Sequence, residues 1–178
     1  MSQNNTNNVS KNTTPETLES FQNLISIIER LRVECPWDRK HTHESLRKLL
    51  IEETYETIEA IDTQNWRELR SQLGDLLLHI IFHTQIASET ESFFLEDVLK
   101  GISEKLVRRH PHVFGDTGER PEAEVLQNWE KIKLEEKKLK STTKISVLEG
   151  VPKALPSLVQ AQRIQEKAAG IGRGCFLP

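Results

Sequence analysis

Apolar residues recur at helical spacing along most of this chain, and β-branched residues do not alternate with polar ones as they do in amphipathic strands. Residues suited to capping a helix N-terminus precede four of the apolar segments, namely Thr14 (followed by Pro15), Thr42, Asn65 and Ser92. The spacing and the caps predict helices over residues 15–32, 42–62, 65–89 and 92–110, a charged helix after the loop 115–121, and a last helix over 155–169. We therefore expect an all-α helical bundle.

The second predicted helix carries acidic residues on the side that should be buried. On a helical wheel, Glu53 points into the middle of the apolar face, Glu56 lies one step to the side, and Glu52 and Glu59 lie further round. A carboxylate on a core-facing stripe is costly unless a positive charge compensates it, and residues 49–65 contain no Lys or Arg. The apolar face consists of Leu46, Leu49, Leu50, Thr57, Ala60 and Ile61.

The third predicted helix carries a polar edge beside its apolar face. Its inward positions are expected to be Leu69, Leu73, Leu76, Leu77 and Ile80, and its edge consists of Gln72, Asp75, His79 and His83. If the two helices face each other, Glu53, Glu56 and Asp75 meet around one point, where they can share a hard divalent cation. The alternative is a solvated acidic helix in which one inward Glu pairs with a distant Lys, and the pattern leaves both interpretations open.

Other residues allow a functional and a structural interpretation. Trp37, in the loop after the first helix, is either a hydrophobic plug or a face on which a base stacks. The histidines His79 and His83 are spaced to bind a transition metal, although we favour a hydrogen-bonded edge because no third soft ligand accompanies them. Lys105 and Arg109, one turn apart, either clamp phosphates or stabilise the helix C-terminus. The same helix should turn Val98, Leu99, Ile102 and Leu106 inward.

Composition narrows the class of protein. The 178 residues suit one domain, and the net charge of −3 argues against general nucleic-acid binding. No apolar run is long enough to span a membrane, the N-terminus lacks a signal-peptide core, and the two distant cysteines suit a cytoplasmic protein. We expect a disordered tail over residues 1–14, a helical domain over 15–140, and a linker, short helix and irregular end over 141–178.

Five motifs occur in order over residues 18–169. They are Cys35-Pro36-Trp37-Asp38, Glu52-Glu53-x-x-Glu56, Leu73-Gly74-Asp75-Leu76-Leu77, Lys105-Leu106-x-Arg108-Arg109-His110-Pro111-His112-Val113-Phe114 and Trp129-x-x-x-Lys133. Each motif is weak alone, but the ordered set resembles the MazG nucleoside triphosphate pyrophosphohydrolases. The resemblance implies a dimeric all-α NTP pyrophosphatase fold in which Mg²⁺, with Mn²⁺ as an alternative, helps water cleave between the α- and β-phosphates of an NTP or dNTP.

The resemblance also implies roles for individual residues. Glu53 and Glu56 match the family's acidic metal-binding pair, and Asp75 matches its later aspartate. Lys105 and Arg109 match phosphate-binding positions, and Trp37 and Trp129 match aromatic positions near the nucleotide. We add Glu52 as a candidate that positions water, so the predicted catalytic residues are Glu52 and Glu53.

Two departures from the family pattern affect this expectation. The pattern places Glu three residues before the aspartate, where this chain has Gln72, a neutral oxygen ligand of similar length. Family members are often longer, with a second related domain that carries the stronger hydrolase site, whereas residues 170–178 do not continue the pattern. Three hypotheses follow: an NTP pyrophosphohydrolase of full or reduced activity, a weakened nucleotide-binding or dimerisation module, and a helical interaction protein. Base and sugar preference stay open.

Overall fold

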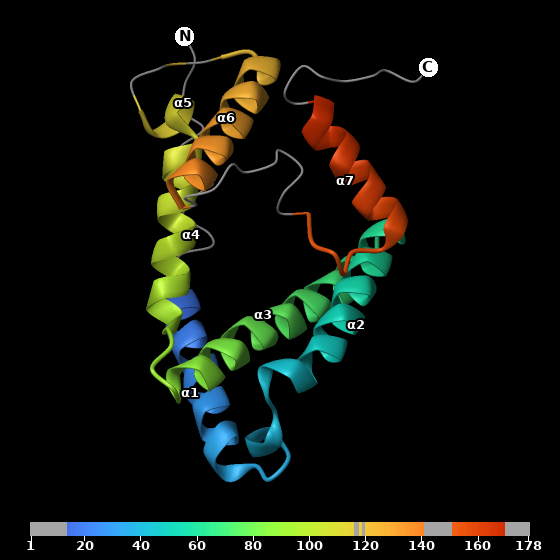
Figure 1. Ribbon diagram of the computed structural model, residues 1–178. Helices are drawn as coiled ribbons and strands as arrows, with labels where there is room; N and C mark the ends of the chain where they lie inside the picture. The colour runs from blue at the N-terminus through green and yellow to red at the C-terminus, as the bar shows by residue number, and fades with distance from the viewer. Residues whose placement is uncertain (1–13, 116–117, 119, 141–150, 170–178) are drawn as a thin grey trace. The chain divides into compact units, whose positions relative to one another are not determined.

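The computed structural model describes residues 14–115, 118, 120–140 and 151–169, and all regular structure in these residues is helical. This confirms the predicted all-α class. Residues 141–150 of the predicted linker region and the irregular end at 170–178 lie outside the described residues, as does all of the predicted tail except Thr14. The elements are α1 (Pro15–Glu34), η2 (Asp38–Lys40), α2 (His43–Asp62), α3 (Trp66–Ser88), α4 (Leu95–Arg109), α5 (Pro111–Phe114), α6 (Glu122–Lys140) and α7 (Ser157–Ala169) (Figure 1).

Three of the predicted caps begin helices as expected. Thr14 accepts a hydrogen bond from the main chain of Thr17, Thr42 accepts one from Ser45, and Asn65 accepts one from Glu68. Each of these bonds satisfies an amide that the first turn of a helix leaves without a partner.

The predicted cap at Ser92 is wrong. The fourth helix begins at Leu95, and there the Asp97 carboxylate accepts a hydrogen bond of 2.8 Å from the Phe94 amide. An acidic side chain three residues into a helix can satisfy an amide at its start, so Asp97 fulfils the role expected of Ser92. The one-turn helix α5 was not predicted.

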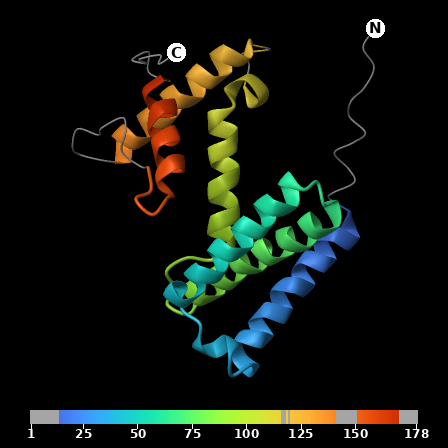
Figure 2. The ribbon, with the colours of Figure 1, turned by 90° about the vertical axis from the view of Figure 1, so that its right-hand side faces the viewer.

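The structure divides into two compact units between Leu99 and Lys100. In the first unit α2 and α3 lie side by side and α1 packs against α3 (Figures 1 and 2). All three helices contribute to one apolar core, since Ile28 comes from α1, Leu46 from α2, and Ile81 and Phe82 from α3. Around these buried residues pack Phe21, Leu24, Ile25, Leu49, Leu77 and Ile86.

A tight turn reverses the chain between α2 and α3. Gln64 adopts a left-handed φ of 53°, and the Asn65 amide donates to the Ala60 carbonyl at 2.9 Å. This pattern is a Schellman motif, which ends a helix and redirects the chain. The two helices therefore run antiparallel, so that later residues of α2 lie beside earlier residues of α3.

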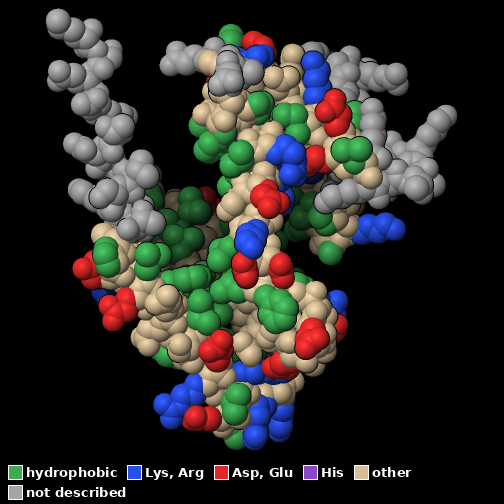
Figure 3. Space-filling view, turned by 90° about the vertical axis from the view of Figure 1, so that its left-hand side faces the viewer, with side chains coloured by type: hydrophobic (Ala, Val, Ile, Leu, Met, Phe, Trp, Pro, Cys, Tyr) green, Lys and Arg blue, Asp and Glu red, His purple; other side chains and the backbone are tan. Residues whose placement is uncertain are grey.

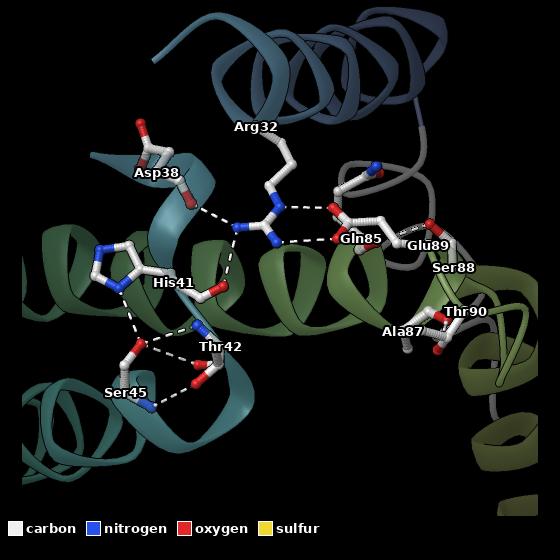
Figure 4. Close-up of polar contacts among 10 residues, drawn as sticks. All are labelled: Arg32, Asp38, His41, Thr42, Ser45, Gln85, Ala87, Ser88, Glu89 and Thr90. Atoms are coloured by element: carbon white, nitrogen blue, oxygen red, sulfur yellow. Dashed lines mark hydrogen bonds and ion pairs between the residues drawn. The ribbon is translucent and has the colours of Figure 1, made fainter. Parts of the chain in front are cut away.

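Arg32 fastens the loop after α1 to the end of α3 (Figure 4). Its guanidinium pairs with both carboxylate oxygens of Glu89, at 2.6 and 2.9 Å. The same group donates to the main-chain carbonyls of Asp38 at 2.6 Å and His41 at 2.9 Å. One partly buried arginine thus fixes the segment that carries Trp37.

The burial of α2 and α3 differs in part from the sequence prediction. Ile61, Leu73 and Ile80, expected inward, are exposed, whereas Gln72 and His79, expected at an edge, are buried. The predicted inward residues of α4, namely Val98, Leu99, Ile102 and Leu106, are also exposed. An amphipathic pattern identifies a stripe of residues that favours burial, but it does not identify the surface that covers this stripe. Figure 3 shows hydrophobic side chains gathered on one face of the molecule.

Among the described residues, no helix is both long enough and apolar enough to cross a membrane.

Candidate functional site

The carboxylates of α2 and α3 interact as the facing-helix prediction required. Burial raises the pKa of Glu53, and the charges of Asp75, Glu56 and Glu52 raise it further. Three of these groups lie on α2 and Asp75 lies on α3, so the effect of Asp75 acts across the helix pair. The antiparallel packing of α2 and α3 therefore brings together acidic groups that are distant in sequence.

Gln72 lies one turn before Asp75 and is buried, with only 6% of its surface exposed. Its amide nitrogen donates to Glu68 Oε1 at 2.9 Å, whereas its own Oε1 is buried without a hydrogen-bond partner. A buried carbonyl oxygen without a partner costs about 1–3 kcal/mol. The Gln72 oxygen is therefore poised to accept a donor or a cation.

An acidic pocket of about 800 Å³ opens between the same two helices. Its lining includes Glu56 and Glu59 from α2, and Glu68 and Gln72 from α3, but no Lys or Arg. Glu56 belongs both to this pocket and to the group that raises the pKa of Glu53. The pocket and the Glu53–Asp75 pair thus form neighbouring parts of one acidic region.

The residues of this region suit a hard divalent cation. Carboxylate and amide oxygens are the ligands that Mg²⁺ and Mn²⁺ prefer, and a bound cation relieves both the repulsion at Glu53 and the unpartnered oxygen of Gln72. Within the described parts of the chain, no three His, Cys, Asp or Glu side chains are already grouped so that they can hold a metal ion.

Glu52, the predicted water-positioning residue, lies at the outer edge of this acidic region. It is exposed, and its carboxylate lies 3.7 Å from Lys48 one turn earlier on α2. The position leaves Glu52 accessible to water and close enough to Glu53 to contribute to the raised pKa of that residue.

Three histidines form a cluster: His43, which the sequence prediction missed, is hydrogen-bonded to His83, and the His79 ring lies beside that of His83. His43 Nδ1 and His83 Nδ1 lie 2.8 Å apart, and their rings stack with centroids 5.1 Å apart. Burial lowers the pKa of His83, and His43 and His79 lower it further. Burial also lowers the pKa of His79, whose Nδ1 is buried without a partner. The His43–His83 bond fits a hydrogen-bonded edge at His83, whereas His79 is buried with its Nδ1 unpartnered.

Trp37 is not buried as a plug. Its side chain is largely exposed, at 63%, and its ring makes an edge contact with His41 at a centroid distance of 4.2 Å. Because Arg32 binds the main-chain carbonyls of Asp38 and His41, just after Trp37, the indole sits on a fixed loop and keeps an exposed surface. This arrangement is suited to stacking with a planar ligand.

The second unit holds the predicted cationic and aromatic residues together. Arg109 contacts the Trp129 ring, with 5.6 Å from its guanidinium carbon to the centroid, and Lys133 Nζ lies 3.9 Å from that centroid. Glu136, which the sequence prediction missed, binds Arg109 at 2.5 Å and Arg108 at 2.7 Å. The hydrogen bond from Arg109 and the one from Arg108 outweigh partial burial and lower the pKa of Glu136 to about 2. Lys105 is exposed one turn before Arg109 on α4.

The fold and the site together define an all-α protein with an acidic region between α2 and α3 whose oxygen atoms are of the type that divalent cations prefer. Residues 41–114 match the MazG nucleotide pyrophosphohydrolase domain, a segment that includes α2, α3 and α4. The chain therefore contains a segment that matches the MazG nucleotide pyrophosphohydrolase domain, in agreement with the motifs.

Individual relatives extend the match over most of the chain. It is 47% identical over 154 residues to the nucleoside triphosphate pyrophosphohydrolase/pyrophosphatase MazG of Thermotoga maritima, covering 85% of this chain and 58% of that protein. It is 40% identical over 158 residues to the nucleoside triphosphate pyrophosphohydrolase of Escherichia coli, covering 87% of this chain and 59% of that protein. The chain thus spans less than two thirds of the length of both relatives.

A solved structure has a similar fold. The crystal structure of a mazG-related protein from Thermotoga maritima superposes with a TM-score of 0.56 at 26% sequence identity. The match covers 64% of this chain and 98% of that one.

Proposed function

We propose that this protein is a divalent-metal-dependent nucleoside triphosphate pyrophosphohydrolase that converts an NTP or dNTP into the monophosphate and pyrophosphate. One observation carries the proposal: Glu53 faces Asp75 across two helices, with Glu56 and Glu52 nearby, and these charges act with burial to raise its pKa. Such a group of carboxylates favours a cation, and it lies in the segment that matches the MazG domain. The names of the Thermotoga and Escherichia coli relatives support the same activity.

The acidic residues have distinct roles in the proposed reaction. Glu53, Glu56, Asp75 and the free oxygen of Gln72 would hold Mg²⁺, or Mn²⁺ in its place. When bound, the ion offsets the negative charge of the triphosphate and polarises its phosphoryl oxygens. Glu52 orients the attacking water and accepts the proton that the water loses. Cleavage between the α- and β-phosphates then releases the monophosphate and pyrophosphate.

The cationic and aromatic residues would bind the substrate. Lys105 and Arg109 are assigned to the phosphates, because ammonium and guanidinium groups both donate hydrogen bonds to phosphate oxygens. Arg109 already shares Glu136 with Arg108, so phosphate binding has to compete with that carboxylate. Of the two candidate aromatic residues, Trp37 keeps more exposed surface for a base, since Lys133 and Arg109 contact the ring of Trp129.

We also propose that a second copy of the chain covers the exposed apolar stripes of α2 and α3. On α2, Ile51, Tyr55 and Ile58 are exposed at helical spacing, and on α3 Leu73 and Ile80 are exposed two turns apart. Stripes of this kind on adjacent helices favour association, and a homodimer or a higher homo-oligomer buries them symmetrically.

The proposed partner is a small anionic substrate, with no nucleic acid and no membrane involved. The acidic region and the net charge of −3 oppose binding to a polyanion. Cys35 is a free thiol, which is compatible with the cytoplasmic location that we propose.

The second candidate is a weakened nucleotide-binding or dimerisation module, and Gln72 favours it. A neutral amide in place of the expected Glu removes one negative charge from the metal site and should lower turnover. An assay of a panel of NTPs and dNTPs with Mg²⁺ separates the two candidates by identifying the products. Monophosphate and pyrophosphate that disappear with a chelator support the enzyme, whereas Mg²⁺-dependent binding without turnover supports the module. Release of orthophosphate without monophosphate would contradict the proposed reaction.

A further inference from the structure

The hydrogen bond between Gln72 and Glu68 has a fixed polarity. An amide has a donor end and an acceptor end, and only the NH₂ end can bind the Glu68 carboxylate. The 2.9 Å bond therefore turns the Gln72 oxygen away from Glu68, where it is buried without a partner. The pair presents one free amide oxygen and one carboxylate, held together on successive turns of α3.

The Glu68 carboxylate has no cationic partner among the described side chains. Its carboxylate accepts a hydrogen bond from a neutral group, and no Lys or Arg in the described part of the chain forms an ion pair with it. Glu68 also lines the acidic pocket with Glu56, Glu59 and Gln72. The Glu68 carboxylate thus lies in the same pocket as Gln72, the position where the family pattern has a Glu.

We propose that Glu68 is a further metal-binding residue and supplies the negative charge that position 72 lacks in this chain. The inference rests on the proposed metal-dependent function. Gln72 acts both as an oxygen ligand and as the group that positions the Glu68 carboxylate one turn away. Gln72 and Glu68 together then provide the charge and the oxygen donor that a single Glu at position 72 would provide.

A structural role for the same bond makes different predictions. Gln–Glu pairs four residues apart stabilise helices, and a Glu in the first helical turn interacts favourably with the helix dipole. Either effect alters the melting temperature of metal-free protein but leaves cation affinity unchanged. Metal affinity, measured separately from stability, therefore distinguishes the two roles.

The test is a titration of the full chain with Mn²⁺, followed by the electron paramagnetic resonance signal of the free ion. Four proteins are compared: the natural chain, Glu68→Gln, Gln72→Glu and the double variant Glu68→Gln/Gln72→Glu. Glu68→Gln keeps the size of the side chain, and circular dichroism verifies that the helices persist. Glu19→Gln, on the exposed surface of α1 in the same unit, is the matched control for the loss of one charge.

We expect Glu68→Gln to weaken Mn²⁺ binding by roughly tenfold, and the double variant to regain the natural affinity to within about threefold. The control should bind Mn²⁺ as the natural chain does. Equal affinity in the natural chain and Glu68→Gln would overturn the inference and leave the proposed function intact, as would a double variant no better than Glu68→Gln. A natural chain that binds no Mn²⁺ would contradict the metal-dependent function itself.

Discussion

Glu53 on α2 faces Asp75 on α3, and their proximity helps to raise the pKa of Glu53 in a partly buried position. The two residues are 22 positions apart, and the Schellman turn at Gln64 and Asn65 makes the helices antiparallel so that they meet. In metal-free protein this arrangement is unfavourable, because like charges repel and Glu53 is partly buried. The cation binding that we propose would relieve this repulsion.

Replacing Glu53 with Gln should separate metal binding from folding. A carboxyl whose pKa is raised on folding destabilises the folded protein above that pKa and is relieved as the pH falls through it. Glu53→Gln should therefore melt at the same or a higher temperature than the natural chain in metal-free buffer at pH 7.5. It should also lose the rise in melting temperature that Mg²⁺ produces. A large fall in the metal-free melting temperature would instead identify Glu53 as a structural partner.

The histidine cluster should make the protein less stable in weak acid. The pKa values of His79 and His83 are lowered, so the unfolded chain binds more protons than the folded chain once the pH falls below about 6.5. Stability is then greatest above pH 6.5 and declines toward pH 5.5. Asp75 opposes this effect at His79, and the raised pKa of Glu53 opposes it at lower pH.

The variant His83→Gln tests the contribution of His83. It removes one titrating group and the repulsion that develops with His43, so its melting temperature should fall less between pH 7.5 and 5.5 than that of the natural chain. Identical falls in the two proteins would show that the pair does not control acid stability.

Arg32 and Arg30 offer a matched comparison on α1. The Arg32 side chain is only 11% exposed, and its loss leaves the Asp38 and His41 carbonyls without their donor. Arg32→Ala should therefore lower the free energy of unfolding by about 2–3 kcal/mol. Arg30 pairs with Glu34 on the exposed surface, and Arg30→Ala should cost less than about 0.5 kcal/mol. Urea denaturation measures both, and equal losses would contradict the assigned role of Arg32.

The apolar stripes of α2 and α3 predict an effect of charge on assembly. Leu73 is 52% exposed on α3. The substitution Leu73→Glu would place a charge in the proposed interface and should convert the oligomer into a monomer. Val33→Glu, at an exposed apolar position on α1, should leave the mass unchanged. Light scattering at micromolar concentration gives the mass of each protein, and a monomeric natural chain would rule out the proposed assembly.

The sequence predicted the helices well because their boundaries depend on local chemistry. Thr42 and Asn65 cap α2 and α3 as expected, and Glu53 is partly buried while Glu52 and Glu56 are exposed. The rotation of α3 was less predictable, because this helix has two apolar lines. The structure buries Leu69 and Leu76 in part, together with Gln72, and exposes Leu73 and Ile80. A wheel does not distinguish a line that packs within the chain from one that is free to meet another surface.

Contacts between distant segments were the least predictable part of the site. His43 binds His83 across 40 residues, and Glu136 joins Arg108 and Arg109 from another helix. In the sequence Glu136 is one member of a charged run, and nothing distinguishes it from solvated neighbours. The link from Gln72 to Glu68 has a local signal in its spacing of four residues, but only the burial of Gln72 makes that spacing informative.

The most direct measurement of the central claim is the release of pyrophosphate from NTPs by the natural chain and Glu53→Gln, assayed side by side. With Mg²⁺, the natural chain should form equal amounts of monophosphate and pyrophosphate, and a chelator should abolish both products reversibly. Glu53→Gln should lose at least about 100-fold in rate, a loss of about 2.7 kcal/mol in transition-state stabilisation. Equal rates in the two proteins, or turnover by the natural chain that persists with the chelator, would contradict the assignment of the α2–α3 carboxylates as the metal-dependent site.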